Sequence, residues 1–105
     1  MAYTEVSSDD ANELLIKAGL SGLYRIEPLD GGWANSNYLL TLDDGLKLVL
    51  KVWDERPPDE VEQIIQHTCW LADHGVLTPT PLLLEGGGRM LVKDNQAWML
   101  MPYID

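Results

Sequence analysis

The chain has 105 residues, of which 46% are hydrophobic, and its formal net charge is −10 at pH 7. This length and composition predict one globular domain, spanning 1–105, that can bury a core without disulfide or metal cross-links. Its 7 basic residues against 17 acidic ones disfavour nucleic acid and anionic membrane surfaces as partners, because both repel such a chain.

Cysteine usage and the N-terminal sequence bear on the compartment. Cys69 has no disulfide partner and no zinc-ligand spacing, which fits a reducing environment. The start, MAYTEVSSDD, lacks the basic residues and apolar run of a signal peptide. No segment approaches the roughly 20 apolar residues of a membrane span. We therefore expect a soluble protein of the cytoplasm.

The first predicted element is a short amphipathic helix in SSDDANELLIKAGL, residues 7–20. Serine and aspartate residues at its start suit helix capping, and Gly19 suits its end. Leu14, Leu15 and Ala18 recur at helical spacing, which gives the helix one apolar face.

Three strands are predicted next, over 23–28, 38–42 and 46–53. LYRIEP and LKLVLKVW alternate between apolar and polar residues, and YLLTL is rich in β-forming residues. The last two strands are separated by an Asp44-Gly45 turn. An antiparallel arrangement of the three strands follows.

A long helix is predicted within RPPDEVEQIIQHTCWLADHG, residues 56–75. Prolines suit its first turn, acidic residues follow them, and Gly75 suits its end. One face is apolar at helical spacing and is expected to pack on the sheet; its members are Val61, Ile64, Ile65, Thr68, Leu71 and Ala72.

The remaining segment predicts further strands. TPTPLLLEGGG, residues 78–88, suggests an extended entry into a strand and then a glycine turn. RMLV (89–92) and AWMLMPYI (97–104) read as strands on either side of a turn at KDNQ. The predicted fold class is therefore α+β: a mostly antiparallel sheet of five or six strands, one long packed helix and a short N-terminal helix.

The glycine-rich stretch DGGWANSNYLL, from Asp30 to Leu40, has two interpretations. Asp-Gly and Gly-Gly supply the positive φ angles of a tight β-turn. Alternatively, glycine lets backbone N–H groups approach an anion such as a phosphate. The stretch alone does not decide between them.

Lys51 stands inside a predicted strand. Alternation places Val49, Lys51 and Trp53 on one face of the sheet, and Leu48, Leu50 and Val52 on the other. A buried cation requires a partner. Otherwise Lys51 either extends along an exposed face or is a charge protecting an edge strand.

The order of these features is that of a nucleotide-binding lobe: a glycine-rich turn, a strand lysine, and a helix with acidic residues. The chain resembles the N-terminal lobe of the aminoglycoside phosphotransferase, choline kinase and homoserine kinase superfamily, small-molecule kinases with a protein-kinase-like fold. The similarity runs from about Leu23 to Asp105, through GGWANSNYLL, LVLKVW, WLADHGVLTPTPLL and WMLMPYID. GGWANSNY, LADHG and TPTP most resemble the homoserine kinase branch.

The resemblance implies roles for particular residues. Lys51 would bind the α- and β-phosphates of ATP, Val49 and Met101 would flank the adenine, and the backbone of Pro102, Tyr103 and Ile104 would form the hinge beside it. Met99 and Met101 are equally well explained as core residues. The loop nearest the phosphates would comprise Gly31, Gly32, Trp33, Ala34, Asn35, Ser36 and Asn37. The loop departs from the protein-kinase pattern of three glycines, so Asn35, Ser36 or Asn37 side chains would supplement its amides.

The acidic partner of the lysine is the weakest part of the resemblance. Alignment of the helix end places Ile64 where the family has its glutamate, between Glu62 and Gln66. We select Glu62 as the predicted partner. The alternative is that these polar side chains form a solvated helix face.

The family's catalytic aspartate lies in a His-Gly-Asp loop, and its magnesium ligands follow, in a second, helical lobe. Neither His67 nor His74 is followed by Gly-Asp, and the sequence reaches the hinge at Asp105. The resemblance thus implies the ATP-binding N-lobe of a kinase of alcohols, with Mg²⁺ held by a C-terminal lobe absent from this chain. The chain alone is expected to be inactive and to have no metal ligands of its own.

Two other interpretations remain open. The chain could be a stand-alone binding or regulatory module with the same fold. It could instead be an acidic interaction domain without kinase ancestry, in which Lys51 faces solvent and 31–37 form a tight hairpin. For an N-lobe the partners are ATP and, in a full-length parent, a small alcohol. Self-association through the apolar stretch WMLMPYI is a further expectation.

Overall fold

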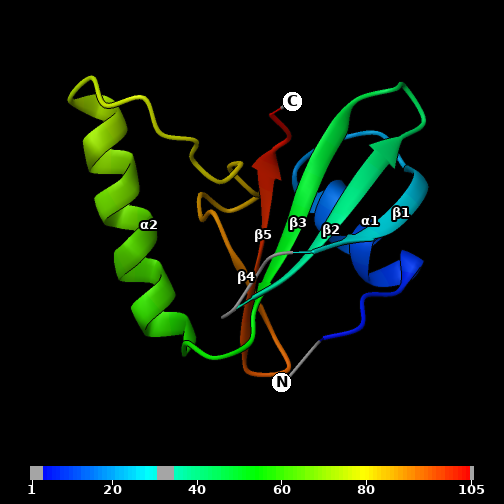
Figure 1. Cartoon of the computed structure of the whole chain (residues 1–105), viewed down its shortest axis with the longest axis horizontal. Coiled ribbons are helices and arrows are strands. Elements are labelled where there is room, and N and C mark those ends of the chain that lie inside the picture. The colour runs from blue at the N-terminus through cyan, green and yellow to red at the C-terminus, as the bar shows by residue number, and fades with distance from the viewer. Residues whose placement is uncertain (1–3, 31–34, 105) are drawn as a thin grey trace.

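A computed structural model describes residues 4–30 and 35–104 of the chain. The elements follow in the order α1 (Ser8–Lys17), β1 (Leu23–Leu29), β2 (Asn35–Leu42), β3 (Lys47–Trp53), α2 (Pro58–Asp73), β4 (Leu91–Lys93) and β5 (Gln96–Pro102). The strands form one five-stranded sheet in the order β1-β2-β3-β5-β4 (Figure 1), and every neighbouring pair is antiparallel. The predicted α+β fold class is confirmed.

The two helices cover opposite faces of the sheet. Leu48, Leu50 and Val52 of β3 belong to the apolar cluster that includes α1. Trp53, two positions beyond Lys51 on the same face of β3, packs against the cluster that includes α2. The predicted alternation along β3 is confirmed.

Neither described helix combines the length and apolar character that a membrane crossing demands.

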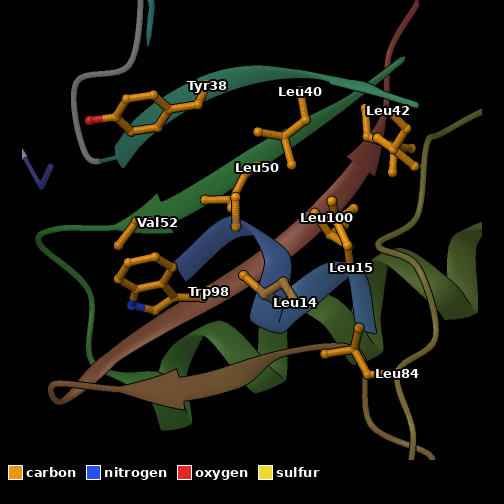
Figure 2. Packing of buried hydrophobic residues seen from close by; sticks show 12 residues of the cluster. Leu14, Leu15, Tyr38, Leu40, Leu42, Leu50, Val52, Leu84, Trp98 and Leu100 are labelled. Carbon is orange, nitrogen blue, oxygen red and sulfur yellow. The ribbon is translucent and has the colours of Figure 1, made fainter. Parts of the chain in front are cut away.

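The larger apolar cluster fills the space between α1 and the sheet. Figure 2 shows Leu14 and Leu15 of α1 directed toward Leu50, Trp98 and Leu100 on the central strands. These five side chains are at most 2% exposed. Burying a leucine side chain fully contributes about 1.5–3 kcal/mol to the free energy of unfolding. This layer therefore supplies much of the stability of the fold.

A smaller cluster lies between α2 and the other face. Val61 and Ile65 of α2 pack against Ala97 and Met99 of β5, and all four are buried. The helix therefore presents the predicted apolar face to the sheet.

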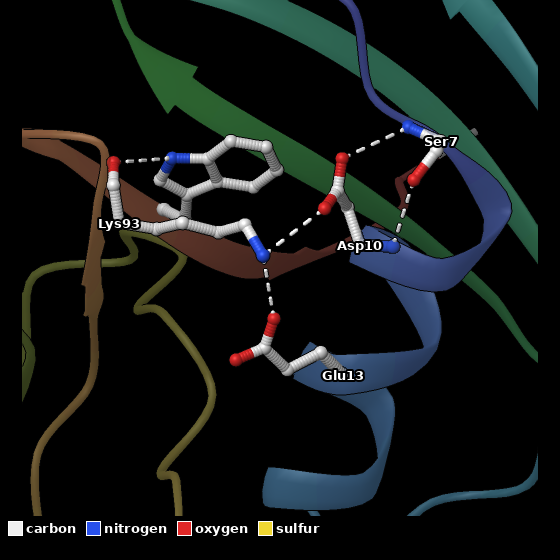
Figure 3. Close-up of polar contacts among 5 residues, drawn as sticks. Ser7, Asp10, Glu13 and Lys93 are labelled. Carbon is white, nitrogen blue, oxygen red and sulfur yellow. Dashed lines mark hydrogen bonds and ion pairs between the residues drawn. The ribbon is translucent and has the colours of Figure 1, made fainter.

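Helix α1 is fastened at its start and along one side. The Ser7 hydroxyl accepts from the Asp10 amide, and the Asp10 carboxylate accepts from the Ser7 amide, each at 3.1 Å. In Figure 3 the Lys93 ammonium lies between Asp10, at 3.1 Å, and Glu13, at 2.7 Å. The Trp98 indole donates to the Lys93 carbonyl at 3.2 Å. The β4–β5 hairpin is thereby tied to α1.

These contacts shift the pKa values of the groups they join. The hydrogen bond from the Ser7 amide, assisted by Lys93, holds the pKa of Asp10 below its ordinary value of 3.8. Hydrogen bonds to Glu13 and Asp10 raise the pKa of Lys93 above its ordinary 10.5. Both shifts favour the charged forms, so the contacts are strongest at neutral pH.

Helix α2 begins and ends as its sequence predicts. Pro57 is the N-cap residue and Pro58 the first helical residue, where a missing N–H costs no hydrogen bond. Gly75 follows the helix with φ of +90°, which lets the Val76 amide reach the Leu71 carbonyl at 3.0 Å.

The segment after α2 departs from the prediction. Residues 76–84 form no strand, although the Leu82 amide donates to the Leu100 carbonyl at 2.8 Å. Pro79 and Pro81 have no N–H to donate to a ladder, which explains why pairing stops at this single bond. β4 begins at Leu91, two residues later than expected. The predicted turn at 93–96 is confirmed: Asp94 and Asn95 both have positive φ, as a two-residue hairpin requires.

Candidate functional site

Lys51 lies in the middle of an interior strand. It is paired with Asn37 of β2 on one side and with Met99 of β5 on the other. A lysine in this place does not protect an edge strand, so that alternative is wrong. Its side chain is half-buried, which also argues against a freely solvated cation.

The Lys51 side chain borders a cavity of about 200 Å³ between the sheet and α2. The sheet supplies Lys51, Trp53, Met99 and Met101 to the wall. The remaining lining comes from α2 and from the segment that follows it: Ile64, Ile65, Thr68, Thr78, Pro79 and Pro81. The cavity is therefore mainly apolar, with one cation in its wall.

The electrostatic surroundings of Lys51 are unusual for a cation. Among the residues that the structure describes, no carboxylate lies within ion-pairing distance of its ammonium. Burial lowers the pKa of Lys51 below its ordinary 10.5, because the ammonium loses hydration. The ammonium nitrogen instead lies 5.5 Å from the centroid of the Trp53 ring.

Glu62, the predicted partner of Lys51, lies elsewhere. Its carboxylate accepts a hydrogen bond of 3.5 Å from Gln66, one turn further along α2. Ile64, the residue that the resemblance aligned with the family's glutamate, lines the cavity instead. The structure does not bring Glu62 to the lysine, and a role for it in nucleotide binding stays a prediction.

The polar residues that open β2 divide between the two faces of the sheet. Asn37 is the cross-strand neighbour of Lys51, and its amide donates to Asn35 at 2.8 Å. The Asn37 side-chain oxygen is buried and lacks a hydrogen-bond partner. Ser36 points to the opposite face and is 1% exposed. The other predicted loop residues, Gly31, Gly32, Trp33 and Ala34, lie outside the described residues.

A partly buried polar network surrounds Ser36. Its hydroxyl accepts from the Thr4 amide at 2.9 Å and donates to Asp54 at 2.6 Å. Asp54 also accepts from the Thr4 hydroxyl at 2.5 Å and from Gln96 at 3.4 Å. The network ties the ends of β2, β3 and β5 to the N-terminal segment. Sequence reasoning missed it, since Thr4 and Gln96 are separated by 92 positions.

The residues predicted to meet the adenine lie along the other half of the same face. Val49 is paired with Met101, and both are half-buried. β5 ends at Pro102, and Tyr103 and Ile104 continue beyond the sheet with exposures of 37% and 70%. The residues that the resemblance assigns to the hinge are therefore accessible at the end of β5.

A model of the phosphotransferase enzyme family matches residues 25–105. The chain belongs to this family. The kinase ancestry inferred from the sequence is thereby confirmed, and the interpretation as an acidic domain without such ancestry is wrong.

Relatives of this phosphotransferase-family chain include two homoserine kinases. The one from Paramagnetospirillum magneticum is 31% identical over 81 residues, which are 76% of this chain and 24% of the relative. The one from Caulobacter sp. is 27% identical over 89 residues, covering 84% of this chain and 28% of the relative. The chain thus spans about a quarter of the length of the curated relatives it matches.

A solved structure has the same fold as this chain. The crystal structure of spectinomycin phosphotransferase in complex with ADP and spectinomycin superposes with a TM-score of 0.73 at 16% identity. The match covers 96% of this chain and 30% of that one.

In the described part of the present chain, no three His, Cys, Asp or Glu side chains are grouped so as to hold a metal ion.

Proposed function

We propose that the chain is the nucleotide-binding N-terminal lobe of an ATP-dependent phosphotransferase that acts on an alcohol group. The observation that supports this most is the position of Lys51: mid-sheet, half-buried, and without an ionic partner among the described residues. A desolvated cation is costly unless an anion neutralises it. A nucleotide phosphate is such an anion, and the solved structure of spectinomycin phosphotransferase is a complex with ADP.

The same face of the sheet divides into two halves that suit the two ends of a nucleotide. Lys51 and its cross-strand neighbour Asn37 form the polar half. Val49 and Met101 form the apolar half and would contact the adenine ring. Pro102, Tyr103 and Ile104 would supply hinge backbone to its edge. Gly31, Gly32, Trp33, Ala34 and Asn35 would contribute to the phosphate side, whereas the Ser36 side chain is used inside the fold.

Catalysis in this proposal requires a second lobe, which would supply the base for the acceptor hydroxyl and the carboxylates for Mg²⁺. The acceptor would be a small alcohol, as homoserine is for the named relatives or spectinomycin for the structural neighbour. The cytoplasm remains the predicted location.

A stand-alone binding module remains the alternative function. The N-lobe and the stand-alone module are both expected to bind nucleotide without turnover.

Nucleotide binding by the isolated chain tests the proposal. ADP, and ATP with Mg²⁺, are titrated into the isotope-labelled chain and followed by NMR. Shifts should concentrate at Val49, Lys51 and Met101. Lys51→Met should weaken binding about tenfold or more, because a hydrogen bond to a charged group contributes roughly 1.5–3 kcal/mol.

The matched control is Lys17→Met at the end of α1, which packs on the other face of the sheet. It removes the same charge from the chain and should leave the affinity unchanged. Equal affinities for wild type and Lys51→Met, or shifts confined to the α1 face, would contradict the proposed function.

A further inference from the structure

The surroundings of Lys51 raise the question of what holds its ammonium before nucleotide binds. Lys51 is the sole titratable group among the described residues that line its cavity. The helix α2 presents Ile64, Ile65 and Thr68 to it, none of which carries charge. The Thr68 hydroxyl already donates to the Ile64 carbonyl at 2.8 Å. The helix therefore offers the lysine no anion from its described side chains.

Trp53 is the aromatic side chain that the strand itself provides. It lies two residues beyond Lys51 and so projects from the same face of β3. Its ring centroid is 5.5 Å from the Lys51 nitrogen, within the roughly 6 Å at which the negative face of an aromatic ring attracts a cation. Tryptophan provides the strongest such attraction among the aromatic residues.

We propose that Trp53 is the positioning residue for Lys51, and that its π face holds the ammonium in the role that a helix carboxylate has in protein kinases. The pairing itself follows from the geometry of β3 and α2. Its consequence for nucleotide binding rests on the proposed function: an ammonium held in the cavity wall meets the phosphates without reordering a flexible side chain.

The position of the ring is determined by packing and by the strand end. Trp53 packs on the cluster of Val61, Ile65, Ala97 and Met99. The next residue, Asp54, is fixed by its hydrogen bonds to Thr4 and Ser36, described above. The backbone beside Trp53 is thus anchored, and the indole has a defined place next to the lysine.

The indole N–H has no part in this arrangement. Trp53 Nε1 is buried and has no hydrogen-bond partner. An unpaired buried donor is costly, so its loss is tolerated. Phenylalanine at position 53 therefore keeps an aromatic face without removing a hydrogen bond. Trp53→Phe is a matched control for Trp53→Leu, which keeps an apolar side chain and removes the π system.

A competing explanation is that Trp53 only shields Lys51 from water, and the two explanations predict pKa changes of opposite sign. If the ring holds the charged form, its removal lowers the pKa of the lysine further below the ordinary value. If the ring only excludes water, a smaller side chain admits water and the pKa of Lys51 rises toward 10.5.

The test is an NMR pH titration of isotope-labelled lysine side chains in the chain without nucleotide. We expect the pKa of Lys51 to fall by about 0.5 in Trp53→Leu and to change by less than half of that in Trp53→Phe. An unchanged or raised pKa in Trp53→Leu would overturn the proposal. The backbone amide signals of α1 in the same samples report any general change in the fold.

A second comparison remains valid if Trp53→Leu does not fold. Phenylalanine and a trifluorinated phenylalanine are placed at position 53; they have nearly the same shape, but fluorine withdraws the negative charge of the ring face. The fluorinated variant should show the lower Lys51 pKa. Equal values would overturn the pairing.

Nucleotide titrations of the same variants separate this inference from the proposed function. Weaker ADP binding in Trp53→Leu than in Trp53→Phe supports the positioning role, and equal binding contradicts that role. If the wild type binds no nucleotide, the proposed function fails, while the Lys51 pKa still decides the pairing.

Discussion

At the scale of single residues, the sequence predicts where Lys51 lies but not what lies beside it. Strand alternation is a strict period of two, so the faces of β3 follow from the sequence and are confirmed. The rotation of α2 about its axis is set by packing of Val61 and Ile65, which turns Ile64 toward the cavity and leaves Glu62 bonded to Gln66. The one available signal for Trp53 was its spacing of two from the lysine.

The half-burial of Lys51 predicts a conflict between stability and function. Lys51→Met keeps the apolar stem and removes a desolvated charge, so we expect the free energy of unfolding to rise by about 1 kcal/mol at pH 7, after loss of the Trp53 contact is included. Urea denaturation measures this change, with Lys17→Met as the control. A variant less stable than wild type would show that the interactions of the ammonium, the Trp53 contact included, outweigh the cost of its desolvation.

The same substitution has a defined pH dependence. The folded-state pKa of Lys51 lies below its unfolded value of about 10.5, so between the two values the unfolded chain binds more protons and wild-type stability rises with pH. The advantage of Lys51→Met should therefore shrink as pH rises through the folded pKa toward 10.5. An advantage that stays constant from pH 7 to 11 would show that the pKa is not lowered.

At the scale of elements, ends marked by specific chemistry were predicted well. Ser7 caps α1, Pro58 begins α2 and Gly75 ends it, because each residue satisfies or removes a terminal backbone group. The strand expected within 78–88 is wrong, because Pro79 and Pro81 have no N–H to donate to a ladder, and the leucine-rich sequence was given more weight than these prolines. The register of the sheet depends on contacts between distant residues and was beyond sequence reasoning.

The contacts that join α1 to the β4–β5 hairpin should stabilise the fold in a pH-dependent way. Asp10→Asn should lower the free energy of unfolding by about 1 kcal/mol at pH 7, because it weakens the capping box and the contact with Lys93. The pKa of Asp10 is lowered in the folded state, so its contribution is present above the unfolded value near 3.8 and is lost as pH falls through the folded value.

Chemical denaturation at pH 7 and at pH 2 measures that difference. The control is Asp9→Asn, an exposed residue in the same helical turn that has the same charge near the helix start. If Asp9→Asn and Asp10→Asn lower the free energy of unfolding equally, the loss comes from the interaction of the charge with the helix dipole and not from the contacts in Figure 3.

At the scale of the whole molecule, the two faces of the sheet have separate tasks. The α1 face is closed by large apolar side chains, and the α2 face keeps a cavity with Lys51 in its wall. A net charge of −10 opposes the approach of a nucleotide. Binding in the proposal therefore depends on this local cation and on Mg²⁺, which lowers the negative charge of ATP.

The apolar C-terminal stretch is mostly covered within the fold. β5 lies between β3 and β4, and Trp98, Met99 and Leu100 are at most 2% exposed. Self-association through this stretch stays a prediction, and its exposed described residues are Pro102, Tyr103 and Ile104. Sedimentation of wild type and Ile104→Ser measures it: a concentration-dependent rise in mass that Ile104→Ser abolishes supports it, and a monomer at high concentration contradicts it.

The division of labour between lobes predicts that nucleotide binding and phosphoryl transfer are separable. The 105-residue chain, offered ATP, Mg²⁺ and homoserine, choline or an aminoglycoside, should consume ATP no faster than its Lys51→Ala variant, because in the proposal the base and the metal carboxylates belong to a second lobe. A complete homoserine kinase is the positive control. Turnover above the Lys51→Ala level would show that these residues already contain a catalytic centre, and the search for its base would then begin with the carboxylates nearest the cavity.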